Sequence, residues 1–292
     1  MMKRILPIAL AGLALMSISS CKNGGSFQKK DGLEYKLVVD KPGQTAKVGD
    51  FVEINIRMLA GNSVMADSRK LNGGKPLEMP IQPSQFRGEW TQGLTLMSPG
   101  DSAVFRMSVD TLKKMLNGQQ LPPFMKPGTY IYYQVSMVAI KSQEDYKKEM
   151  DGKAMQQKDV DDKLLQDYLA KNNIKATKTA SGMYYTVQAE GKGDMVKLGD
   201  TVSINYVGKT MDGKVFDSNT DPSKGHMKPL TFAAGMHQMI PGMDEGVMML
   251  KKGGKATLYI PSGLGYAERS PGPGVPANSI LIFDVDVTDV KH

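Results

Sequence analysis

VSINYVGKTMDGKVFDS (residues 202–218) is the stretch that decides the fold, together with MIPGMDEGVMMLKKGGKATLYIP (residues 239–261). In the first segment apolar and polar residues alternate from Val202 to Val207, which predicts a half-buried strand. The following Asp212-Gly213 pair is a strong hairpin signal and predicts a turn into a second strand.

The second segment predicts a short helix followed by a strand. Pro241-Gly242 opens the helix, and the glycine pair Gly253-Gly254 separates it from a strand over residues 256–260. A loop rich in Gly and Pro (261–279) and an alternating strand (280–290) complete the pattern. We expect an α+β fold, in which a twisted antiparallel sheet wraps on one short helix.

These residues resemble the FKBP-type peptidyl-prolyl isomerases. The motifs that carry the resemblance are YxGxxxDGxxFDS, IPGxxEGxxxxxxGGKxxxxIP, GYA and PxxxPxNSxLxFDVxV, in the family's order and spacing over about the last ninety-five residues. The resemblance implies an FKBP-type domain over residues 181–292 that isomerises X-Pro bonds.

The resemblance also implies which residues form the site. The implied catalytic residues are Tyr206, Phe216, Asp217, Ile240, Tyr266 and Phe283, and the implied substrate-binding residues are Leu230, Phe232, Met239 and Met243. Phe216 and Phe283 would form apolar walls around the proline ring, with Met243 as its floor. The Ile240 N–H and the Tyr266 hydroxyl would donate to carbonyls flanking the proline, and Asp217 would accept from Tyr206. Met243 departs from the tryptophan common at the floor, so weaker packing on the ring is expected.

The composition argues against other chemistries. Rotation about an amide bond needs neither cofactor nor metal, and we expect none. The chain has only three histidines, which disfavours a zinc site or a His-based catalytic triad. Its formal charge of +7 comes without a nucleic-acid-binding motif, so solvated lysines are the simpler explanation.

The N-terminus predicts export. Residues 1–20 have a basic start, an apolar middle and a small-residue end, which is typical of a secretory signal peptide. Cys21, the only cysteine, lies where a bacterial lipobox needs its acylated residue, so we expect a lipid attached to Cys21 and a flexible tether over residues 21–30. We expect the protein to be held in the cell envelope by this lipid. Because Lys22 follows the cysteine, we favour an anchor in the outer membrane with the protein facing the periplasm.

An internal repeat predicts a second domain. Lys47-Val48-Gly49-Asp50 echoes Lys197-Leu198-Gly199-Asp200 at an offset of 150, and other matches extend the similarity over residues 31–141. Ile56 stands in place of Tyr206, and Ala66 in place of Phe216. We therefore expect a divergent FKBP-like copy without activity; a substrate-holding or dimerising module is the alternative.

The segment between the copies (142–180) is charged and predicts helix. Its apolar stripe includes Leu164, Leu165 and Leu169, Asp151-Gly152 is expected to split it into two helices, and Asn172-Asn173 is expected to end it. It is interpreted as a spacer, or else as an arm that forms a homodimer. The chain as a whole is thus predicted to isomerise X-Pro bonds in exported polypeptides and assist their folding, and the alternative is a non-catalytic chaperone that grips Pro-containing segments.

Overall fold

The computed structural model describes residues 26–115, 121–122, 124–224 and 226–292. By its internal contacts the chain divides into two units, Met1–Lys147 and Lys148–His292. The predicted signal peptide, Cys21 and the first part of the tether lie outside the described residues. In the described part of the chain, no helix is both long and apolar enough to cross a membrane.

The N-terminal unit is built on one antiparallel sheet with the strand order β1-β2-β6-β7-β3-β4, and β5 pairs with β3 at its edge. Short helical segments connect the strands. The strands are β1 (Gln28–Lys30), β2 (Leu33–Val39), β3 (Phe51–Ala60), β4 (Ser63–Asp67), β5 (Leu77–Pro80), β6 (Ser102–Ser108) and β7 (Tyr130–Lys141), and the helical segments are α1 (Ser68–Leu71), η1 (Trp90–Leu96) and α2 (Val109–Met115).

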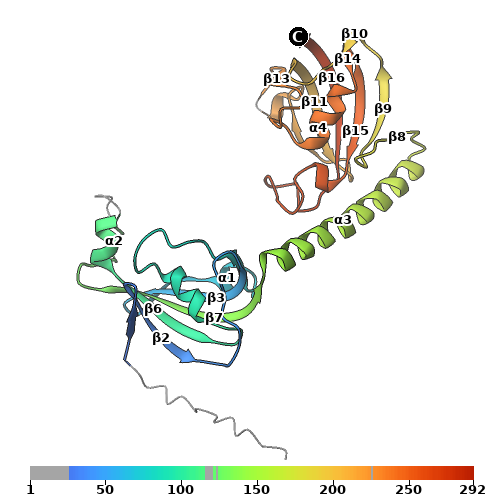
Figure 1. Cartoon of the computed structure of the whole chain (residues 1–292). Helices are drawn as coiled ribbons and strands as arrows, with labels where there is room; N and C mark the ends of the chain where they lie inside the picture. The colour runs from blue at the N-terminus through green and yellow to red at the C-terminus, as the bar shows by residue number, and fades with distance from the viewer. Residues whose placement is uncertain (1–25, 116–120, 123, 225) are drawn as a thin grey trace, which may run out of the picture. The chain divides into compact units, whose positions relative to one another are not determined.

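The C-terminal unit repeats this plan with the order β12-β11-β16-β15-β9-β8, and β13 pairs with β11. Helix α4 packs on one face of the sheet over β15 (Figure 1). The strands are β8 (Thr177–Lys178), β9 (Tyr184–Ala189), β10 (Lys192–Met195), β11 (Thr201–Thr210), β12 (Val215–Ser218), β13 (Leu230–Ala233), β14 (Lys251–Lys252), β15 (Lys255–Ile260) and β16 (Leu281–Lys291), and the helical segments are α4 (Pro241–Met248), η2 (Pro222–Lys224) and η3 (Ser262–Leu264).

The alternation in β11 fits its place in the interior of this sheet, with one face turned to the core. Val202, Ile204 and Tyr206 face the core and are buried, whereas the residues between them are only partly covered. Strand β11 is bordered by β16 on one side and by β12 and β13 on the other. The predicted sheet, hairpin and short helix on one face are confirmed, and α3 packs on the sheet as well.

The prediction of a divergent second copy of this fold is also confirmed. Strands β3 and β11 begin and end at residues separated by 150 positions. Each is paired with the last strand of its sheet through a bulge at the same place, between Glu53 and Ile54 in the first unit and between Ser203 and Ile204 in the second. A shared bulge position indicates a shared backbone plan, because a bulge shifts the register of every later pair.

The helical segment on the sheet differs between the units. In the C-terminal unit it is α4, and in the N-terminal unit it is the 3₁₀ segment η1. Both keep a glycine where the segment crosses the sheet: a Cβ would lie 2.3 Å from a Leu258 methyl carbon at Gly246, and 2.1 Å from the Phe105 ring at Gly93. The close approach of segment to sheet is therefore common to both copies, although the helix is not.

Helix α3 (Gln143–Lys171) is continuous, so the expected break at Asp151-Gly152 is wrong. A Cβ on Gly152 would meet nothing within 4 Å, and one exposed glycine costs a long helix only about 1 kcal/mol. The expected end is confirmed, because the chain leaves the helix at Asn172 and Asn173 has a positive φ of 54°.

The apolar stripe of α3 packs on the C-terminal sheet. Leu165 and Leu169 are buried in a cluster with Tyr184, Tyr259 and Ile282. Leu164, which the sequence also placed in the stripe, is 45% exposed. The second half of this helix is thus part of the packing of the C-terminal unit, and the boundary between the two units falls inside α3.

Candidate functional site

The structure brings the sequence-predicted site residues together on the inner face of the C-terminal sheet. The aromatic and aliphatic ones belong to a single hydrophobic cluster, and Asp217 joins it through a hydrogen bond to Tyr206. The buried members are Tyr206, Phe232, Met243 and Phe283, and the partly buried ones are Phe216, Leu230, Met239, Ile240 and Tyr266. Their roles in binding and catalysis remain predictions.

A glycine creates the space in which the aromatic rings meet. Gly208 on β11 pairs with Asp217 on β12 and with Phe283 on β16, so three strands converge at this point. The rings of Phe216 and Phe283 meet edge to face over it, with centroids 5.6 Å apart and planes at 88°. A Cβ on Gly208 would lie 2.7 Å from the Phe283 ring and 2.8 Å from the Phe216 ring. Any larger residue would therefore push the two walls apart.

Tyr206 and Asp217 form the polar edge of the site. The Tyr206 hydroxyl donates to Asp217 Oδ2 at 2.7 Å, and the Ser218 N–H donates to Asp217 Oδ1 at 2.9 Å. Burial, together with the hydrogen bond to Asp217 and the charge of that carboxylate, raises the pKa of Tyr206 far above its ordinary value. Burial and the nearby charge of Asp217 also raise the pKa of Tyr266. Both hydroxyls are therefore neutral donors at physiological pH.

Two donors at the site are left free for a ligand. Within the described residues, the Tyr266 hydroxyl has no hydrogen-bond partner, and the N–H of Ile240 at the start of α4 has no acceptor. Ile240 is the N-cap residue, and its carbonyl is already engaged by Met243 and Asp244 of the helix. Free N–H groups at a helix start favour a carbonyl oxygen.

Three polar residues that the sequence analysis missed hold this arrangement. His226 Nε2 lies 3.1 Å from Asp217 Oδ1 and 3.3 Å from the Tyr206 hydroxyl oxygen. The buried Asn219 fixes β11, since its Oδ1 accepts from the Tyr206 N–H at 2.8 Å. The buried Asp244 accepts from the N–H of His237 at 3.0 Å and so fixes the loop that carries Ile240. Two features of the sequence could have pointed to these residues: the scarcity of histidine, and the position of Asn219 directly after the FDS motif.

The corresponding positions in the N-terminal unit carry different side chains. Met58 occupies the position that Gly208 has in the C-terminal unit. It pairs with Tyr133 and Ala66, as Gly208 pairs with Phe283 and with its partner on β12. A long side chain therefore stands where the C-terminal unit has none. Trp90 stacks on Tyr133, with ring centroids 5.1 Å apart and planes at 12°. The edge-to-face ring pair over a glycine is thus not repeated at these positions of the N-terminal unit.

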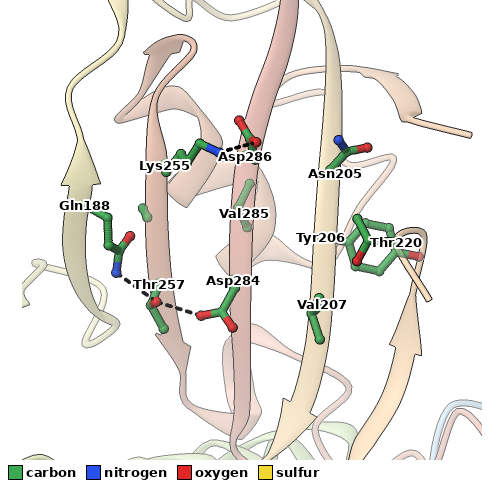
Figure 2. A pocket seen from close by; sticks show the side chains of 11 residues that line it. Gln188, Asn205, Tyr206, Val207, Thr220, Lys255, Thr257, Asp284, Val285 and Asp286 are labelled. Carbon is green, nitrogen blue, oxygen red and sulfur yellow. Dashed lines mark hydrogen bonds and ion pairs between the residues drawn. The ribbon is translucent and has the colours of Figure 1, made fainter.

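A different hollow lies on the polar side of the C-terminal sheet (Figure 2). It measures about 370 Å³ and crosses β9, β15, β16 and β11. Figure 2 shows its polar side chains largely paired with one another: Lys255 with Asp286 at 2.8 Å, and Thr257 with Asp284 at 2.7 Å. Tyr206 is the one predicted site residue that lines it. The paired charges make this face a solvated sheet surface, and the aromatic cluster remains the candidate site.

Comparisons with known proteins place part of the C-terminal unit in a family. Residues 192–288 match the model of the family described as FKBP-type peptidyl-prolyl cis-trans isomerase. A probable FKBP-type peptidyl-prolyl cis-trans isomerase of Haemophilus influenzae is 41% identical over 138 residues, covering 47% of this chain and 54% of that protein. Its Neisseria meningitidis counterpart, a probable isomerase called FkpA, is 40% identical over 144 residues, covering 49% of each.

Among solved structures, the crystal structure of FkpA from Escherichia coli aligns with 62% of this chain and 78% of its own, at 27% identity and a TM-score of 0.39. The chain spans about half the length of the curated relatives it matches. The match to the family runs from β10 into β16 and includes every predicted catalytic and substrate-binding residue, whereas Cys21 lies outside it. Residues 192–288 of this chain therefore form a domain of the FKBP-type peptidyl-prolyl cis-trans isomerase family.

Proposed function

We propose that the C-terminal unit catalyses the cis–trans isomerisation of X-Pro bonds in polypeptides. The observation that carries this proposal is the cluster of aromatic and aliphatic side chains, called the cup below, in which the Ile240 N–H and the Tyr266 hydroxyl have no partner among the described residues. The uncatalysed reaction faces a barrier of about 18–20 kcal/mol, because rotation removes the resonance of the amide. A rotating imide is less polar than a planar one, so a dry apolar surface stabilises it relative to water.

Each residue of the cup has a role in this rotation. Phe216 and Phe283 would hold the proline ring while Met243 supports it from below. The Ile240 N–H would hold the carbonyl on one side of the twisting bond, and the Tyr266 hydroxyl would hold a neighbouring one. Asp217, kept in place by Tyr206 and Ser218, would present its negative charge to the rotating carbonyl carbon. No bond is made or broken and no proton is transferred.

The N-terminal unit and the predicted anchor complete the proposal. Met58 and the Trp90–Tyr133 stack support a catalytically silent first unit. The sequence around Cys21 supports attachment by lipid in the cell envelope, with exported polypeptides as substrates; loss of radiolabelled palmitate from Cys21→Ser tests this. Met155 and Leu164 are exposed apolar residues on α3 and support a homodimer along this helix, which sedimentation equilibrium tests.

The mature full chain is expected to accelerate proline-limited refolding. The rate constant of the slow phase of a test protein should rise in proportion to the concentration of this chain. The same test protein, refolded after a pulse of unfolding too short for its prolines to isomerise, should gain nothing. Rates on a short X-Pro peptide, which has no fold to assist, separate catalysis from chaperoning. Absence of acceleration in both assays by a folded protein would refute the proposal.

Gly208→Ala is expected to lower kcat/KM on the short X-Pro peptide by about tenfold. The added methyl group would overlap both aromatic walls, and overpacking of this kind costs about 1–3 kcal/mol, shared between stability and the shape of the cup. Gly152→Ala is the matched control, because its added carbon meets nothing within 4 Å, and it should leave kcat/KM unchanged. Equal kinetics for the two variants would show that the rings do not need this gap.

A further inference from the structure

A second hollow in the C-terminal unit has no role in the reaction described above. It measures about 780 Å³, which is within the range of ligand sites, and lies between the part of α3 from Met150 to Asp161 and the loop that follows β15. Met150 and Ala154 line it from the helix, and Leu264 lines it from the loop.

The hollow is joined to the candidate active site by two side chains, Leu264 and Tyr266. Tyr266 lines the hollow and also packs against the aromatic cluster of the cup. Burial and the charge of Asp217 raise the pKa of Tyr266. A chain whose proline lies in the cup and whose carbonyl reaches Tyr266 would therefore continue into the hollow.

The walls of the hollow are held by buried hydrogen bonds. Asp161 of α3 is 1% exposed and accepts from the Ser262 N–H at 2.7 Å and from the Ser262 hydroxyl at 2.6 Å. Gln157 donates to the other oxygen of Asp161 at 2.7 Å. Both oxygens of this carboxylate accept hydrogen bonds from the protein, so these contacts hold the helix and the loop together at the hollow without a ligand.

The remaining charges favour an acidic occupant. Lys158 and Arg269 line the hollow, and within the described residues neither has a carboxylate within 4.0 Å. Lys153, also on its wall, is paired with Glu149 at 2.8 Å. Glu268 is the one acidic lining residue besides Asp161. Two unpaired cations beside apolar side chains are complementary to an extended peptide with acidic side chains.

We propose that this hollow binds the polypeptide segment adjoining the substrate proline, and that Lys158 and Arg269 select acidic residues in that segment. The inference rests on the proposed function, because the proline in the cup delivers the segment. It predicts that the enzyme distinguishes substrates by sequence several residues away from the isomerising bond, where an extended chain advances about 3.3–3.6 Å per residue.

Fluorescence anisotropy on the full chain tests this with defined peptides. One is a short core centred on Leu-Pro. Two further pairs of peptides extend this core by six residues, one pair on its N-terminal side and one pair on its C-terminal side. Within each pair, one extension contains four glutamates and the other contains four glutamines. With the unaltered protein at low salt, one of the two glutamate peptides should bind about tenfold more tightly than its glutamine counterpart. The preference should shrink at 0.5 M NaCl.

Two variants locate the binding. The double variant Lys158→Glu, Arg269→Glu should abolish the preference for glutamate. Ala154→Trp, at an exposed helix position, should fill the hollow and weaken the binding of the long peptide about tenfold relative to that of the short core. Lys163→Glu and Ala170→Trp, exposed on the same helix outside the hollow, are the matched controls and should keep both ratios.

The outcomes separate the two proposals. Unchanged ratios in both test variants overturn the hollow as a peptide site, even if the short X-Pro peptide is isomerised. A changed ratio in a protein that isomerises no peptide supports the hollow and refutes the proposed catalysis. Unchanged ratios combined with a shifted sedimentation coefficient for Ala154→Trp would assign the hollow to a second copy of this chain, which also overturns the inference.

Discussion

Phe216→Ala is expected to lower kcat/KM for X-Pro isomerisation by about thirty- to hundredfold. The Phe216 ring is one of two that meet over Gly208, and it is partly exposed, so it can contact a bound proline as well as the core. Loss of such a wall removes about 2–3 kcal/mol of apolar contact from the rotating imide. The measurement is the rate on the short X-Pro peptide.

Two variants make this result specific. Phe216→Leu keeps an apolar wall and should lose less than tenfold. Phe124→Ala removes a phenylalanine that is 43% exposed in the N-terminal unit and should leave the rate unchanged. Thermal unfolding of Phe216→Ala should remain cooperative, because the side chain is only partly buried. A loss below threefold in a folded Phe216→Ala protein would show that this ring does not form the substrate wall.

Asp161→Ala is expected to destabilise the C-terminal unit by about 2–4 kcal/mol. The substitution leaves the N–H and the hydroxyl of Ser262 buried without an acceptor, and each unsatisfied group costs about 1–3 kcal/mol. Because Ser262 begins the turn that leads to Tyr266, the rate on the short X-Pro peptide should also fall. Urea unfolding gives the first effect, and hydrogen exchange at the Ser262 amide gives the local one.

Asp167→Ala is the matched control, since this aspartate is exposed on the same helix and should shift neither measurement. Asp161→Asn keeps one oxygen that can accept from Ser262 and should give an intermediate loss. If the Ser262 amide exchanges equally slowly in Asp161→Ala and Asp167→Ala, the contact between α3 and the loop does not stabilise the unit.

Much of the fold could be predicted because its signals are local. The alternation in β11 and the Asp212-Gly213 turn specify a hairpin without reference to the rest of the chain. The position of the second copy followed from the same local pattern repeated 150 residues earlier. The continuous helix α3 was missed because Gly152 is a helix breaker only on average, and the anchoring of the helix at Leu165 and Leu169 overrides it.

Only those site residues that lie within a recognisable sequence motif could be predicted. Phe216 and Asp217 lie in such a motif, and the structure places them beside Tyr206 and Phe283. The contacts of His226 depend on the path of a loop that no periodicity describes. The difference between Gly208 and Met58 could not be interpreted from the sequence alone. It depends on the strand register and on the two aromatic rings that lie over the glycine.

The packing of α3 on the sheet has a consequence for anyone who excises the C-terminal unit. The family match begins at residue 192, whereas the packed unit begins at Lys148. A fragment cut near the family boundary would lose Leu165 and Leu169 and uncover the apolar surface of Tyr259 and Ile282. Hydrophobic surface exposed in this way promotes aggregation, so a soluble fragment has to include α3 from its middle onward.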